Sequence, residues 1–179
     1  MYRYLLLAFC LIMLPTTTPA NADEQSDAPA KVSKAQQANA IFTKIKSLAG
    51  DWEHAAGPAK GQLALSVTVI AGGSAIVERQ FPGSPMEMVT VYHLDGDEVM
   101  LNHYCMLGNQ PRLKARMSDR KNTIKFDFVS ATNLASKNDA HMHEGELTIV
   151  DKDTIKSTWT KFENAKPAGD HSFQMIRRK

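Results

Sequence analysis

The chain has 179 residues, of which 22% are charged and 43% are hydrophobic, a balance typical of one ordinary globular domain. This composition excludes a disordered protein and a membrane protein with several spans. Lys and Arg number 21 against 19 Asp and Glu, and a formal charge of +2 gives no basic surface of the kind that binds phosphate backbones. We therefore expect no nucleic-acid partner.

The first 22 residues have the pattern of a signal peptide for export. Arg3 precedes an apolar run from Leu5 to Leu14, and Ala20-Asn21-Ala22 forms a cleavage site before Asp23. The run is too short to anchor the chain, because a membrane-spanning helix needs roughly 20 apolar residues. We expect cleavage, a periplasmic or secreted protein, and no stable membrane anchor in the mature chain.

The mature chain begins with a predicted arm and one helix. Residues 23–33 are rich in Ala, Asp, Gln and Ser, which favours a flexible arm. From Lys34 to Leu48 apolar side chains recur at helical spacing, and Gly50 follows. This pattern predicts one short amphipathic helix at the start of the folded domain.

Beyond Gly50 apolar and polar residues alternate, as in Leu63–Val69, Leu113–Met117 and Ile124–Phe128, which is typical of strands with one solvated face. Nine turn signals delimit about ten such strands. Short antiparallel strands in hairpin order avoid exposed edges most simply by closing into a barrel. Residues 34–179 are therefore predicted to form a single all-β domain, an antiparallel up-and-down β-barrel of about ten strands with one short N-terminal helix. A β-sandwich is the alternative.

The turn at Asp95-Gly96 predicts which side chains face the barrel interior. Alternate residues of a strand share a face, so a two-residue turn here places Tyr92 on the same face as Leu101, His103 and Cys105. Leu101 marks this face as the apolar one. Cys105 is the only cysteine of the mature chain, which excludes an intramolecular disulfide.

The same rule applies near the C-terminus. It places His141 and His143 on the face of Leu147, provided that no bulge intervenes near Gly145. Trp159 follows on the inner face of the next strand. Histidine, cysteine and tyrosine side chains are thereby predicted to gather inside one barrel.

Three interpretations of this inward cluster remain open. The polar groups can satisfy one another in a filled core, they can contact a bound organic molecule, or His103, Cys105, His141 and His143 can ligate zinc or haem iron. An enzymatic variant uses His103 or His141 as an acid or base, or a His/Cys metal centre that activates water.

A short motif resembles a known superfamily of barrels. Ser47-Leu48-Ala49-Gly50-Asp51-Trp52 places a Gly-x-Trp after the helix, and it resembles the calycins, which include lipocalins, fatty-acid-binding proteins and nitrobindin-like barrels. The resemblance implies that Trp52 closes the barrel end and packs against Arg177 of the last strand. In nitrobindin-like barrels a histidine near the C-terminus binds haem, and His171 stands nearest to that position.

A wider likeness covers most of the mature chain. It rests on Gly72-Gly73-Ser74-Ala75, Phe81-Pro82-Gly83, residues 88–97, His103-Tyr104-Cys105, Gly108-Asn109-Gln110-Pro111-Arg112, Thr132-Asn133-Leu134 and His141-Met142-His143. These segments resemble an uncharacterised family of exported bacterial lipocalin-like proteins. The likeness implies export and a barrel and supplies no activity.

These observations favour a periplasmic barrel that binds a small, largely apolar molecule, because a small-molecule site needs apolar walls and a few converging polar groups. The predicted ligand-binding residues are Tyr92, Leu101, His103, Cys105, His141, His143 and Trp159. No metal site is favoured. The alternatives are a haem- or zinc-binding barrel, an enzyme that uses the His/Cys cluster, and a structural or partner-binding protein with a filled barrel.

Overall fold

The computed structural model describes residues 32–179. The predicted signal peptide and the predicted arm up to residue 31 lie outside the described residues. The elements are α1 (Lys34–Lys46), β1 (Gly50–His54), β2 (Leu63–Ile70), the short 3-10 turn η1 (Ala71–Gly73), β3 (Ala75–Gln80), β4 (Met88–Asp95), β5 (Glu98–Tyr104), β6 (Gln110–Met117), β7 (Thr123–Thr132), β8 (His141–Asp151), β9 (Thr154–Glu163) and β10 (Lys166–Arg177).

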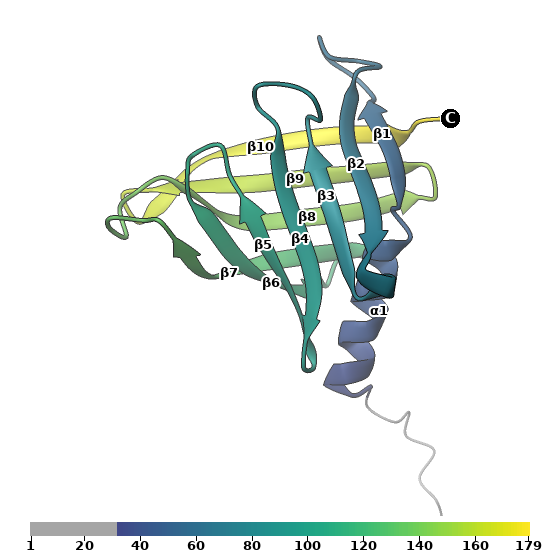
Figure 1. Cartoon of the computed structure of the whole chain (residues 1–179), viewed down its shortest axis with the longest axis horizontal. Coiled ribbons are helices and arrows are strands. Elements are labelled where there is room, and N and C mark those ends of the chain that lie inside the picture. The colour runs from purple at the N-terminus through teal and green to yellow at the C-terminus, as the bar shows by residue number, and fades with distance from the viewer. Residues whose placement is uncertain (1–31) are drawn as a thin grey trace, which may run out of the picture. The chain divides into compact units, whose positions relative to one another are not determined.

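The ten strands form one closed antiparallel barrel. Each strand pairs with its neighbour in the sequence, and β1 pairs with β10 to complete the ring (Figure 1). The predicted up-and-down β-barrel with one N-terminal helix is confirmed, and the β-sandwich is wrong. Among residues 32–179, no helix has the length and apolar character needed to span a membrane.

Helix α1 begins with a capping box. The Ser33 hydroxyl accepts from the Gln36 backbone N–H at 3.2 Å, and the Gln36 side chain accepts from the Ser33 N–H at 2.9 Å. The buried residues Ala38, Ile41, Phe42 and Ile45 belong to the same apolar core as the barrel strands. The helix contacts β4, β5 and β6, and it covers one end of the barrel.

The barrel closes at Trp52, as the calycin resemblance implies. The Trp52 side chain is fully buried, and its indole N–H donates to the Leu48 carbonyl at 2.8 Å. The Arg177 guanidinium lies 4.3 Å from the indole ring centroid and donates to the carbonyls of Ala49 (2.8 Å) and Ser47 (3.1 Å). One side chain of the last strand therefore joins β1 to the end of α1.

The β4–β5 hairpin has the predicted register. Asp95 pairs with Glu98 across a two-residue turn, Tyr92 pairs with Leu101, and His103 pairs with Thr90. The inner face of this hairpin carries both polar and apolar side chains. All four of them are buried: Thr90, Tyr92, Leu101 and His103.

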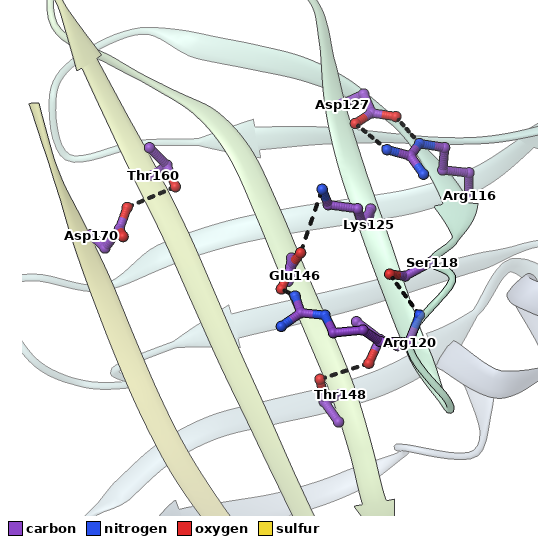
Figure 2. Close-up of polar contacts among 10 residues, drawn as sticks. Arg116, Ser118, Arg120, Lys125, Asp127, Glu146, Thr148, Thr160 and Asp170 are labelled. Atoms are coloured by element: carbon purple, nitrogen blue, oxygen red, sulfur yellow. Dashed lines mark hydrogen bonds and ion pairs between the residues drawn. The ribbon is translucent and has the colours of Figure 1, made fainter. Parts of the chain in front are cut away.

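The outer face of β6 to β10 carries paired polar side chains. Figure 2 shows Arg116 with Asp127, Arg120 and Lys125 with Glu146, and Thr160 with Asp170, each pair joining neighbouring elements of the sheet. Exposed pairs of this kind contribute little to stability. They identify this surface as the solvated face of the barrel.

Gly145 of β8 makes room for two stacked aromatic rings inside the barrel. The rings of Phe126 and Trp159 lie 5.7 Å apart and within 8° of parallel. A Cβ atom at Gly145 would lie 3.0 Å from carbon atoms of both rings. We expect Gly145→Ala to lower the free energy of unfolding by about 1–3 kcal/mol, measured by chemical denaturation, because overpacking forces the rings apart.

Glu144→Ala is the matched control, because Glu144 is the exposed neighbour on the same strand. This control should change stability by less than about 0.5 kcal/mol. Equal stabilities of Gly145→Ala and the native chain would contradict the tight contact.

Candidate functional site

The barrel end away from α1 is formed by the loops β1–β2, β3–β4, β5–β6 and β7–β8 and by the β9–β10 turn, as the antiparallel topology requires. A cavity of about 450 Å³, here called the outer cavity, opens at this end. Its lining residues are Gln80, Phe81, Met86, Met88, His103, Met106, Leu107, Met142, Trp159, Lys161, His171 and Phe173. The β3–β4 and β5–β6 loops thus supply part of its wall.

Two predicted site residues lie together in the wall of the outer cavity. The rings of His103 and Trp159 stack at 5.5 Å with an interplanar angle of 22°. His103 is 2% exposed, and burial lowers its pKa to about 4. The imidazole is therefore neutral at pH 7. Its Nδ1 lies 2.9 Å from the Thr90 hydroxyl oxygen.

A second, much smaller space of about 20 Å³, here called the inner chamber, shares Gln80, Phe81, Trp159 and Phe173 with the outer cavity. Its volume suits about one water molecule. Tyr92 also lines this chamber, so the structure separates Tyr92 from the outer cavity.

A buried carboxyl group, that of Glu78, lines the inner chamber. The Tyr92 hydroxyl donates to Glu78 Oε2 at 2.8 Å, and the Gln80 amide donates to Glu78 Oε1 at 2.9 Å. Burial raises the pKa of Glu78, against the two hydrogen bonds, which lower it. Burial and the Glu78 charge also raise the pKa of Tyr92. Both oxygens of the Glu78 carboxyl are thereby hydrogen-bonded within the barrel.

His141 and His143 are placed differently from the alternation rule. The β8–β9 register shifts between Met142 and Glu144, so the condition that no bulge intervenes is not met. Met142 lines the outer cavity, and neither histidine does. The extra residue of the bulge interrupts the alternation on which the predicted placement of the two histidines depends.

The two histidines instead form a compact group with aromatic side chains. His143 lies between Phe128 and Phe162, at centroid distances of 4.4 and 3.9 Å. His141 Nε2 lies 2.9 Å from His143 Nδ1, and His141 Nδ1 donates to the Asp139 carbonyl at 2.8 Å. Burial and the neighbouring His141 lower the pKa of His143. This group holds the β7–β8 loop to the start of β8.

Leu101 and Cys105 also lie apart from the outer cavity. Leu101 is fully buried in the apolar core. Cys105 is buried just after β5, and burial raises the pKa of its thiol. Within the described part of the chain, no three His, Cys, Asp or Glu side chains are arranged to hold a metal ion. The alternative ligand set of His103, Cys105, His141 and His143 is therefore not assembled as one centre.

Most of the cavity wall was not predicted. The residues missed include Met86, Met106 and Leu107, which lie in loops. His171, which the nitrobindin resemblance singles out, is an exposed residue at the rim of the cavity. One signal was available in the sequence, because large apolar side chains at turn positions are unusual where polar residues are expected. Met106 and Leu107 follow Cys105 directly and precede the turn at Gly108.

No protein-family model matches this chain, and no curated protein matches it significantly. The closed ten-stranded barrel with one helix is consistent with a calycin-like fold.

Proposed function

We propose that this protein binds a small, largely apolar molecule in the outer cavity. The observation that carries the proposal is the cavity itself, with a volume of about 450 Å³ and an aromatic or aliphatic side chain at eight of its twelve lining positions. Ligand sites commonly have volumes of about 300–1,000 Å³ and mostly apolar walls with a few polar groups.

The side chains of the wall can adapt to apolar ligands of different shapes. Met86, Met88, Met106 and Met142 contribute flexible thioether side chains, which adjust to irregular apolar surfaces. Met86, Met106 and Leu107 are also exposed at the mouth, so apolar surface extends from the solvent to the interior. His103 and Trp159 are the two predicted binding residues that line this cavity.

The experiment compares two leucines of similar exposure. Leu107 is 42% exposed and lines the cavity, whereas Leu94 is 38% exposed and does not. Binding of the hydrocarbon probe diphenylhexatriene is followed by its fluorescence. We expect Leu107→Asp to weaken binding about tenfold or more, because the carboxylate loses hydration beside an apolar ligand.

The Leu94→Asp control should bind the probe as the native chain does. Equal weakening in both variants, or no fluorescence increase with the native chain, would contradict binding in the outer cavity.

The resemblance to exported lipocalin-like proteins supports a further part of this proposal. We propose that the chain is exported, cleaved before Asp23, and acts in the periplasm or outside the cell. The support is the leader pattern of residues 1–22.

A further inference from the structure

Trp159 brings an unpartnered donor to the interior of the barrel. Its side chain is 5% exposed, and its indole N–H makes no hydrogen bond within residues 32–179. An indole N–H can only donate. Among the described residues, only Asn109 Oδ1 and Arg112 Nε are side-chain polar atoms that lack both a hydrogen-bond partner and accessible surface. The Trp159 nitrogen is not one of them, so it keeps accessible surface. Trp159 lines both the outer cavity and the inner chamber.

His103 presents a second donor. The Thr90 hydroxyl is fully buried, and its one hydrogen-bond partner among the described residues is His103 Nδ1. If Nδ1 carried the proton, the Thr90 O–H would be a buried donor with no acceptor, which is unfavourable. The favoured arrangement therefore has Thr90 donating to Nδ1, and the neutral ring then carries its proton on Nε2.

Further polar groups of the outer cavity include His103 Nε2 and Lys161. His103 Nε2 has no partner within residues 32–179 and is not among the enclosed atoms, so it too keeps accessible surface. Lys161, whose ammonium lies 3.2 Å from Glu163 Oε2, adds a cationic group to the wall, and no Asp or Glu side chain lines this cavity. The two unpartnered ring N–H groups of the wall therefore face no carboxylate among the lining side chains, and the Gln80 amide supplies one neutral oxygen acceptor.

We propose that the ligand is an apolar molecule with an sp² oxygen acceptor, a carbonyl or a carboxylate, that accepts from the Trp159 and His103 N–H groups. This inference rests on the proposed function and narrows its ligand class. An alkylammonium group carries only donors and cannot accept from the Trp159 and His103 N–H groups, so the same cavity discriminates against it. A hydrocarbon would fill the apolar space and leave both ring donors unpartnered.

The experiment uses four probes with similar apolar chains: 2-undecanone, decanoate, undecane and undecylamine. The native chain has only two tryptophans, so a ¹⁵N-labelled sample gives two indole N–H signals by NMR. The Trp52 N–H already donates to Leu48 and serves as an internal control. We expect 2-undecanone and decanoate to move the Trp159 signal in the direction of hydrogen-bond formation, and undecane to produce no such shift.

Binding constants of the native chain and Trp159→Phe complete the test. Phenylalanine keeps an aromatic ring and removes the N–H. The loss of apolar contact affects 2-undecanone and undecane alike, so it cancels when the two losses of affinity are compared. We expect the variant to weaken 2-undecanone about threefold to tenfold more than it weakens undecane. The native chain should bind both oxygen-bearing probes at least about tenfold more tightly than undecylamine.

A second pair of variants addresses the imidazole. His103→Phe should reproduce this selective loss, whereas His93→Phe, at a half-buried position outside the cavity, should bind all probes as the native chain does. Tighter binding of decanoate than of the ketone would place a negative charge near Lys161, and the reverse order would identify a neutral carbonyl.

Equal losses of ketone and hydrocarbon binding in Trp159→Phe, with an unshifted Trp159 signal, would overturn the acceptor inference and leave apolar binding intact. Failure of all four probes to bind would overturn the proposed function as well.

Discussion

Replacing Trp52 by alanine is expected to lower the free energy of unfolding by about 3–5 kcal/mol. The substitution removes a fully buried indole ring at the junction of β1, β10 and α1. It also removes the ring beneath the Arg177 guanidinium and the hydrogen bond to the Leu48 carbonyl. Chemical denaturation monitored by circular dichroism measures the loss.

Tyr104→Ala provides the control for the Trp52 variant. Tyr104 is also a large aromatic residue, but it is 53% exposed at the end of β5, so its removal should cost less than about 1 kcal/mol. A loss below about 1 kcal/mol for Trp52→Ala would show that this residue does not close the barrel.

The second large effect is a loss of stability in acid that comes from His103. The pKa of this group is about 4 in the folded chain and about 6.5 in the unfolded chain, so between these values the unfolded chain binds more protons. The contribution of neutral His103 to the free energy of unfolding is therefore complete above pH 6.5 and decreases as the pH falls toward 4. The difference between these two pKa values corresponds to about 3 kcal/mol in the free energy of unfolding.

The measurement is the free energy of unfolding as a function of pH for the native chain and His103→Gln. The glutamine side-chain oxygen can still accept from the Thr90 hydroxyl, and the amide does not titrate. The difference between the two curves cancels other groups, including His143, whose lowered pKa acts in the same direction, and Glu78, whose raised pKa acts oppositely. Parallel curves between pH 4 and 6.5 would contradict a buried neutral His103.

The regular parts of the barrel follow from the sequence. Alternation and a two-residue turn suffice to pair Tyr92 with Leu101 and to bury His103, because the side-chain period of a strand is two. The helix pattern is equally direct, although α1 ends at Lys46 and the apolar pattern extends to Leu48. The capping geometry of the last turn decides that boundary, and the periodicity does not reveal it.

The candidate site was less accessible to such reasoning. The bulge between Met142 and Glu144 adds a residue that no local pattern reveals, and it separates His141 and His143 from the outer cavity. The cavity walls also depend on loops, where alternation gives no information about direction. Met86 and Leu107 meet His103 and Trp159 only because the closed ring brings alternate loops to one end.

Native mass spectrometry of the protein purified from its own source most directly tests the claim that the outer cavity binds a small apolar molecule. We expect the mass of the chain that begins at Asp23 plus one organic molecule of a few hundred daltons. The fraction of chains that carry this molecule should be lower in Leu107→Asp. A haem or zinc adduct would contradict an organic ligand. The bare polypeptide mass, unchanged after incubation with diphenylhexatriene or 2-undecanone, would contradict ligand binding in the barrel.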